Sequence, residues 1–214
     1  MIDIYVINLN SRKDRFIKIV DLFKNYNNIT LHRVEGVEHK NGIIGCFLSH
    51  KKCIKYAKDN NMKNIVVIED DCLPLGDYFE DRLINIKSYL DNINDWDIFI
   101  GGGFNIVGCY HIKYKLDTNL DNLYMSNSGF CMHLIIYNQR SYDFFLDFDE
   151  NKNIPIDNIW QDKFMAIVPV PFLATQYNDF SNIENVNKDH SKIIKSNKRL
   201  IRYVSCTNIP IKNI

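Results

Sequence analysis

Short apolar runs alternate with longer segments of helical periodicity through the first hundred residues of the chain. The runs at residues 2–9, 28–36 and 64–68 are rich in β-branched and aromatic residues, which is typical of strands. Between them, residues 11–26 and 42–60 carry apolar side chains three and four positions apart, which indicates amphipathic helices. This alternation predicts an α/β protein with a mostly parallel central sheet and helices on both of its faces.

The later part of the chain continues the pattern less regularly. We expect helices at residues 76–93 and 138–148, strands at 96–103 and 129–137, and a proline-broken pair of strands at 164–176. Ser11 is the expected N-cap of the first helix. Because no repeat and no linker interrupts the pattern, we expect one domain over residues 1–214, in which residues 188–214 could form a basic appendage.

The balance of charge and the cysteines narrow the function classes. Lys plus Arg equals Asp plus Glu at 26 each, so no overall field directs the chain to nucleic acid. No basic leader precedes the first apolar run, and no stretch reaches the roughly 18 apolar residues of a membrane span. Six cysteines are scattered without a C-x-x-C pair. We therefore expect a cytoplasmic protein with free thiols.

Three consecutive acids, Glu69, Asp70 and Asp71, follow the buried-type strand in "KNIVVIEDDCLP", residues 63–74. In open α/β sheets, ligands bind outside the carboxyl ends of the strands, and the glycines that end "WDIFIGGG" belong at the same edge. A hard divalent cation would offset the repulsion of clustered carboxylates and could bridge the protein to a nucleotide's phosphates. A solvated acidic loop and a receiver-type phosphoacceptor pocket are the alternatives.

Further polar residues belong near the same edge. Arg12 and Arg15 follow the first strand, where a guanidinium fork suits a diphosphate, although both could be exposed charges at a helix start. Ser49 and His50 occur in "GCFLSH" and could bind a ligand or form structural hydrogen bonds. Since neighbouring residues on a helix do not face each other, the pair is not a catalytic triad.

Three motifs together resemble those of glycosyltransferase family 25, the lipopolysaccharide-type and collagen galactosyltransferases. They are "YVINLNSRKDR" at residues 5–15, "GIIGCFLSH" at 42–50 and "VVIEDDCLP" at 66–74. Weaker similarity continues through "SGFCMHLIIYNQRSYDFFL" and "IPIDNIW" to "ATQYNDFSNI", which ends at residue 183. The resemblance therefore covers most of the chain.

The resemblance implies a GT-A-like nucleotide-binding domain and an inverting transfer of galactose or glucose from a UDP-sugar to a hydroxyl of a glycan or protein. It also implies a divalent cation, commonly Mn²⁺, bound at a D-x-D-like motif. Asp71 is the first expected metal ligand and Glu69 the second. The expected donor-binding residues are Arg12, Arg15, Ser49, His50, Glu69 and Asp70. A catalytically inactive sugar- or protein-binding relative and a nucleotidyltransferase-like enzyme remain the alternatives.

Asp157, in "NIPIDNIW", matches the acid of the family's P-x-D element and is the expected catalytic base. Trp160 could provide an apolar wall for a sugar ring. The competing interpretation makes Asp157 a helix N-cap, and Glu184 is the next candidate for the base. The basic segment at residues 188–202 could contact an anionic membrane peripherally or form a solvated helix.

Overall fold

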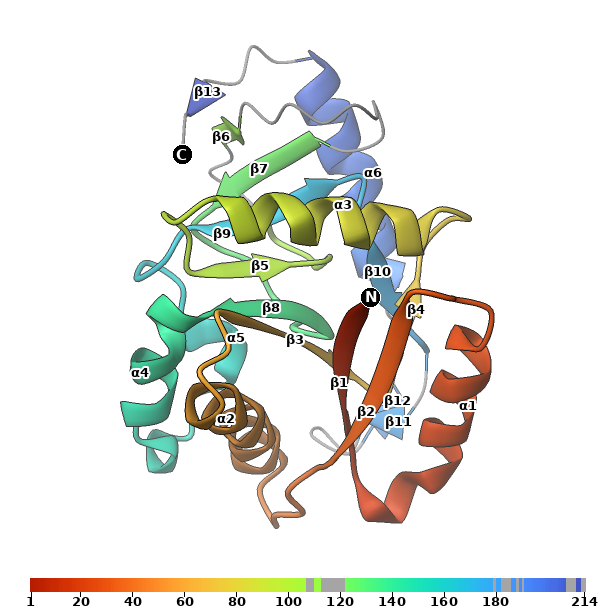
Figure 1. Ribbon diagram of the computed structural model, residues 1–214, viewed down its shortest axis with the longest axis vertical. Coiled ribbons are helices and arrows are strands. Elements are labelled where there is room, and N and C mark those ends of the chain that lie inside the picture. The colour runs from red at the N-terminus through yellow and green to blue at the C-terminus, as the bar shows by residue number, and fades with distance from the viewer. Residues whose placement is uncertain are drawn as a thin grey trace.

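The computed structural model describes residues 1–106, 110–112, 122–178, 180–181, 186–187, 189, 191–206 and 211–212. The described part of the chain is built around a nine-stranded sheet with the strand order β13-β6-β7-β9-β5-β8-β3-β1-β2 (Figure 1). Its strands are β1 (Ile2–Asn8), β2 (Ile29–Glu35), β3 (Asn64–Glu69), β5 (Ile98–Ile100), β6 (Tyr110–Ile112), β7 (Asn122–Ser126), β8 (Leu134–Asn138), β9 (Ala166–Val170) and β13 (Ile211–Lys212).

Seven of the nine strands point in the same direction. Strand β1 runs parallel to β2 and β3, β5 runs parallel to β9, and β6 runs parallel to β13. The exceptions are β8, which is antiparallel to both β3 and β5, and β7, which is antiparallel to both β6 and β9. The predicted fold class, α/β with a mostly parallel central sheet, is confirmed.

Helices cover both faces of this sheet, and two apolar clusters separate them from it. Helices α1 (Lys13–Phe23) and α3 (Phe79–Asn92) contribute to one cluster, and α2 (Gly42–Asp59), α4 (Gln139–Asp147), α5 (Ile156–Ile159) and α6 (Ser191–Cys206) contribute to the other. In β3, Val66 and Ile68 enter the first cluster while Ile65 and Val67 enter the second. This two-sided burial explains the uninterrupted apolar run.

Short elements complete the edge of the sheet that carries the acids. The 3₁₀ helix η1 (Asn10–Arg12) links β1 to α1, and β4 (Cys72–Pro74) pairs antiparallel with β10 (Ala174–Gln176). The remaining elements are the 3₁₀ helix η2 (Glu150–Lys152) and the paired strands β11 (Phe180–Ser181) and β12 (Val186–Asn187). The predicted N-cap at Ser11 is wrong, because η1 occupies that position and α1 begins only at Lys13.

The basic segment forms α6, which packs against the sheet rather than standing free in solvent. Ile193 and Leu200 are buried in the second cluster, while Lys195, Lys198 and Arg199 are exposed. This amphipathic pattern accounts for the helix without a membrane, so contact with an anionic membrane stays a prediction. None of the described helices is long and apolar enough to cross a bilayer.

Within the described part of the chain, Cys46, Cys53, Cys72 and Cys131 form no disulfide bond, as predicted. Cys109 and the side chain of Cys206 lie outside the described residues. For the part of the chain that is described, the expectation of cysteines without disulfide bonds therefore holds.

The glycines that follow β5 allow three segments to meet closely. A Cβ at Gly101 would lie 2.6 Å from the Leu134 side chain, a Cβ at Gly102 would overlap the Ala174 carbonyl oxygen, and a Cβ at Gly103 would overlap the Phe130 carbonyl oxygen. Strand β5 thus ends in glycines because β8 and β10 approach its backbone at this edge.

Replacing Gly102 by alanine should therefore lower the free energy of unfolding by about 2 to 3 kcal/mol, because the backbone of β10 must move. Urea denaturation measures the change. Gly76→Ala is the matched comparison, since its Cβ meets nothing within 4 Å and only the positive φ of 78° opposes it, so we expect a loss of about 1 kcal/mol. Equal losses in the two variants would contradict the close approach.

Candidate functional site

A cavity of about 290 Å³ lies at the carboxyl ends of β1, β2 and β3. Residues that follow β1, residues that follow β2, the first turns of α2 and the three acids after β3 line it; among them are Leu9, Arg12, Arg15, Glu38, Cys46 and Asp71. This is the edge at which the strand pattern places a ligand. The predicted gathering of the acids and the two arginines at one site is therefore seen.

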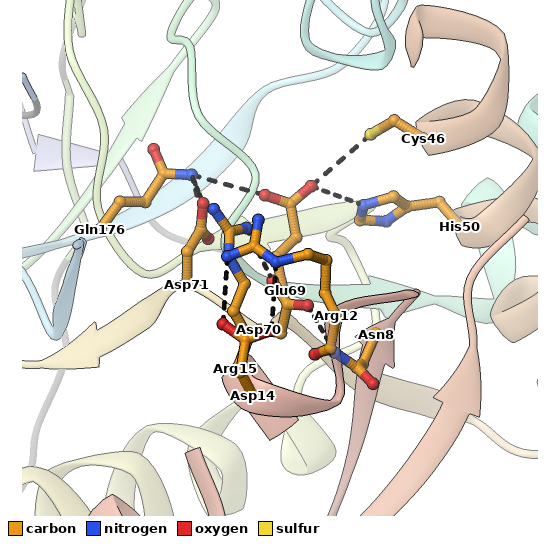
Figure 2. Close-up of polar contacts among 10 residues, drawn as sticks. All are labelled: Asn8, Arg12, Asp14, Arg15, Cys46, His50, Glu69, Asp70, Asp71 and Gln176. Atoms are coloured by element: carbon orange, nitrogen blue, oxygen red, sulfur yellow. Dashed lines mark hydrogen bonds and ion pairs between the residues drawn. The ribbon is translucent and has the colours of Figure 1, made fainter. Parts of the chain in front are cut away.

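Glu69 lies between two groups of side chains, and its two carboxylate oxygens face in different directions (Figure 2). Its Oε1 accepts a hydrogen bond from the Cys46 thiol at 3.6 Å and lies 3.4 Å from His50 Nε2. Its Oε2 accepts from Gln176 Nε2 at 3.4 Å. Burial alone would raise the pKa of Glu69, but the hydrogen bond and charge of His50, with the charge of His133, lower it below the usual glutamate value. Glu69 is therefore held as a carboxylate.

Both carboxylate oxygens of Asp70 are bound by other side chains of the protein. Its Oδ2 accepts a hydrogen bond from Asn8 Nδ2 at 2.7 Å, and its Oδ1 forms an ion pair with Arg15 Nη1 at 3.1 Å. The side chains of Asp70 and Arg15 are only 10% and 11% exposed. Burial raises the pKa of Asp70, and the Asn8 hydrogen bond and the Arg15 charge oppose that rise. Asp70 thus positions Arg15 at the cavity.

Asp71 has no cationic partner among the contacts seen in its described surroundings. Gln176 Nε2 lies 3.3 Å from both of its carboxylate oxygens, and its backbone carbonyl accepts from Tyr177 N at 2.9 Å. Burial, followed by the charges of Glu69 and Asp70, raises the pKa of Asp71 to about 8. Its ionised form is therefore unfavourable until a positive charge arrives.

Gln176 supplies the observation that tests whether a cation fits here. Its Nε2 donates to Glu69 and Asp71, while its Oε1 is buried and has no hydrogen-bond partner among the described residues. A buried amide oxygen without a partner is costly. Rotating the amide by half a turn would point Oε1 at the two carboxylates, an arrangement that a cation between them would make favourable. Three oxygen donors of this kind suit Mg²⁺ or Mn²⁺.

The two predicted arginines both line the cavity, and each already has an acidic partner. Arg12 Nε lies 3.2 Å from the exposed carboxylate of Asp14, and Arg15 binds Asp70. The Asp14 pair is solvent-exposed and contributes little stability, so an incoming anion could replace it. The predicted binding of a diphosphate by Arg12 and Arg15 stays a prediction.

Ser49 and His50 serve the local structure directly. The Ser49 hydroxyl donates to the Gly45 carbonyl at 2.7 Å and accepts from Val37 N at 2.8 Å, which fixes the loop from β2 onto α2. His50 is fully buried and does not line the cavity, and its Nδ1 lies 2.9 Å from the Tyr137 hydroxyl. Any role of His50 in donor binding would therefore act through Glu69.

Asp157 is not the N-cap of α5, because Pro155 holds that position and Asp157 is the second residue of the helix. Its Oδ2 instead accepts a hydrogen bond from Cys131 N at 3.0 Å. The capping interpretation is therefore wrong, while the base role stays a prediction.

Trp160 is fully buried, so the expected apolar wall for a sugar ring is wrong as well. Glu184, the alternative base, lies outside the described residues.

Sequence reasoning missed three residues of the site: Asn8, Cys46 as a partner of Glu69, and Gln176. Asn8 ends β1 and looks like an ordinary strand residue, and Gln176 comes from β10, more than a hundred residues after the acids. A signal for Gln176 existed in "ATQYNDFSNI", the segment similar to the family's closing glutamine element. Its partner acids could not be assigned without the antiparallel pairing of β4 and β10.

The family model described as "Glycosyltransferase family 25 (LPS biosynthesis protein)" matches residues 21–160, about two thirds of the 214-residue chain. The matched segment contains Ser49, His50, the three acids and Asp157, whereas Arg12, Arg15 and Gln176 lie outside it. A comparison with curated proteins finds no match.

Several solved structures are similar at low sequence identity. A197 from STIV is 10% identical, with a TM-score of 0.46 over 89% of this chain and 96% of that one. A putative glucose-1-phosphate thymidylyltransferase from Bacillus anthracis is 8% identical, with a TM-score of 0.43 over 93% and 76% of the two chains. Mannose-1-phosphate geranyltransferase from Thermus thermophilus is 5% identical, with a TM-score of 0.41 over 78% and 72%.

The raised pKa of Asp71 predicts that Asp71→Asn stabilises the metal-free protein at alkaline pH. Because the folded-state pKa of about 8 lies above that of an unfolded aspartate, the wild type loses stability as the pH rises from about 4 to about 8. The amide variant lacks this loss. At pH 8.5 with a chelator present, urea denaturation should show Asp71→Asn more stable by about 1 to 3 kcal/mol, with the difference shrinking toward pH 4. A variant less stable than wild type at pH 8.5 would contradict the assignment.

Proposed function

This chain belongs to glycosyltransferase family 25, and we propose that it transfers galactose or glucose from a UDP-sugar to a hydroxyl group of a glycan or protein, with inversion of configuration. Asp71, Glu69 and Gln176 would hold a divalent cation, with Mn²⁺ as the expected ion. The observation that carries the proposal is that two carboxylates line a cavity beside two arginines and contact an amide whose buried oxygen has no partner among the described residues.

The position of the cavity supports a nucleotide as the ligand. It opens where β1, β2 and β3 end, beside η1 and the start of α1, and its lining carries both basic and acidic side chains. Arg12 and Arg15 can donate paired hydrogen bonds to diphosphate oxygens. The Asn8–Asp70–Arg15 chain fixes the second guanidinium in advance, which reduces the entropy lost on binding.

When bound, the cation would offset the negative charge that develops on the departing diphosphate. Side chains of the protein set the charges of the two acids and the position of Arg15. Glu69 stays ionised through His50, Asp71 gives up its proton as the positive charge arrives, and the Asp70 pair keeps Arg15 facing the cavity. Acceptor activation needs a separate carboxylate, since the acids beside the diphosphate lie on its side and are less basic when they bind a cation.

The cation assignment predicts that UDP stabilises the wild type strongly only with Mn²⁺ present. Asp71→Asn should remove this Mn²⁺-dependent rise in melting temperature, and Gln176→Ala should weaken UDP affinity in Mn²⁺ by about 10- to 100-fold. Thermal shift and calorimetric titration measure both effects. Asp77→Asn, which changes an exposed acid a few residues beyond the cluster, is the matched control and should bind as the wild type does.

UDP binding that is equally strong with a chelator, or unchanged in both cavity variants, would refute the cation site. Release of UDP from UDP-galactose or UDP-glucose in the presence of acceptors tests the transfer itself. Consumption of a nucleoside triphosphate with a sugar phosphate would instead favour the nucleotidyltransferase alternative. Full Mn²⁺-dependent binding without any turnover would favour the inactive binder.

We propose Asp157 as the base that takes the proton of the acceptor hydroxyl. It is half-buried on α5, which packs against α2, and its negative charge contributes to the raised pKa of the Cys46 thiol, so it lies close to the cavity wall. Its Oδ2 binds Cys131 N. The carboxylate thus has a fixed orientation from which it could accept a proton.

Asp157→Asn separates a chemical role from a structural one, because the asparagine oxygen can still accept the Cys131 N–H bond. A base role predicts a melting temperature and UDP affinity near wild type and turnover lower by about 100-fold or more. Asp157→Ala, which also removes the hydrogen bond, should in addition lose about 1 kcal/mol of stability. Retained turnover in Asp157→Asn would exclude it as the base.

A further inference from the structure

We propose that Cys46, His50 and Glu69 form a second metal site, which takes a thiophilic divalent cation such as Zn²⁺ and shares Glu69 with the all-oxygen site at Asp71. Cys46 and His50 lie one helical turn apart on α2, so both side chains leave the same face of the helix. Glu69 ends β3 opposite that face. Sulfur, imidazole nitrogen and carboxylate oxygen are the ligands that zinc takes in proteins.

The distances among the three ligand atoms suit a tetrahedral ion. With ordinary zinc bond lengths, adjacent ligands of a tetrahedron are about 3.6 Å apart for sulfur and oxygen and about 3.4 Å apart for nitrogen and oxygen. Here Cys46 Sγ lies 3.6 Å and His50 Nε2 lies 3.4 Å from the same oxygen, Glu69 Oε1. All three atoms lie within 4.8 Å of one another. An ion can therefore enter with small side-chain movements.

The imidazole already has the support that metal-binding histidines usually have. His50 is fully buried, and its second nitrogen, Nδ1, lies 2.9 Å from the Tyr137 hydroxyl. A hydroxyl can either donate or accept, so this hydrogen bond survives the change of tautomer that frees the Nε2 lone pair for a metal. Such an outer partner fixes the ring orientation and strengthens the ligand.

The surroundings argue against a nucleophilic role for the same thiol. Cys46 donates to Glu69 rather than to His50, and burial with the negative charge of Glu69 raises its pKa well above the usual value. A cysteine nucleophile needs the opposite, a lowered pKa beside a positive group. In this cluster a cation can replace the thiol proton, which binding would release to solvent.

The metal site would be open to the cavity, because Cys46 and Glu69 line the cavity. His50 is fully buried and lies on the side of the site away from the cavity. The fourth position of a tetrahedral ion would then face the cavity, where water or a ligand oxygen could occupy it. Glu69 has one oxygen facing each site, Oε1 toward Cys46 and Oε2 toward Gln176 (Figure 2). If the proposed donor site is correct, zinc here should compete for Glu69 and inhibit transfer.

Cobalt titration tests the site without any assay of activity. Metal-free, reduced wild-type protein should bind one Co²⁺ with a thiolate-to-cobalt charge-transfer band in the near ultraviolet, and Zn²⁺ should displace it. Cys46→Ala should abolish the band. Cys53→Ala is the matched control, since Cys53 is an unpaired thiol on the same helix and contributes no ligand; it should retain the band.

Tyr137→Phe gives a graded readout, because it removes only the hydroxyl that orients His50. Cobalt affinity should fall by about 10-fold while the band keeps its shape. Melting curves of all variants check that they are folded, and Cys46→Ser replaces Cys46→Ala if the latter is not. No band in folded wild type, or a band that persists when Cys46 is replaced, would overturn the proposal.

Loss of the metal site and loss of the proposed function give different results. A cobalt band in a protein without UDP-sugar turnover leaves the metal site standing and rejects the transferase. Turnover with Mn²⁺ but no cobalt band would support the transferase and reject the metal site. If both hold, micromolar Zn²⁺ should slow wild-type turnover and should slow Cys46→Ala less, relative to that variant's own zinc-free rate. Equal inhibition would overturn the link between the two sites.

Discussion

The site depends on how three consecutive carboxylates at the end of β3 are kept from repelling one another. Glu69 ends β3, Asp70 and Asp71 form the turn that follows it, and each acid meets a different partner. Glu69 reaches His50 on α2, Asp70 turns to Asn8 and Arg15, and Asp71 reaches Gln176 on β10. The first two carboxylates are offset by protein groups of opposite charge or by strong donors. Among the described residues, the third carboxylate is bound by the Gln176 amide, and it is the acid whose pKa rises to about 8.

Much of the surrounding fold serves this arrangement. The glycines after β5 let β10 approach the sheet, and the pairing of β10 with β4 places Gln176 opposite Cys72, the residue after Asp71. Helix α2 presents Cys46 and His50 on one face, with Ser49 anchoring the loop from β2. The 3₁₀ turn after β1 replaces a capped helix start and brings Arg12 to the cavity wall. The raised pKa of Asp71 is the kind of perturbation that functional sites often show.

Sequence periodicity predicted the early strands and helices because burial on one or both faces determines which positions along the chain are apolar. It also located the acids and arginines, since residues after parallel strands share an edge. It did not predict that β8 runs antiparallel between β3 and β5, because strand direction depends on contacts between distant segments. The same limit hid Gln176 and Asn8. Trp160 and the Ser11 cap were misjudged because local pattern does not report whether a ring is covered or a turn tightens into a 3₁₀ helix.

The central claim is that Asp71, Glu69 and Gln176 hold a hard divalent cation at the cavity. Crystals grown with UDP and MnCl₂ would test it most directly, through the anomalous scattering of manganese. The account predicts a single strong peak within about 2.5 Å of an Asp71 carboxylate oxygen, with the Gln176 amide turned so that Oε1 faces the ion and with the diphosphate beside Arg15. Ordered UDP in the cavity without a manganese peak at Asp71 would contradict it.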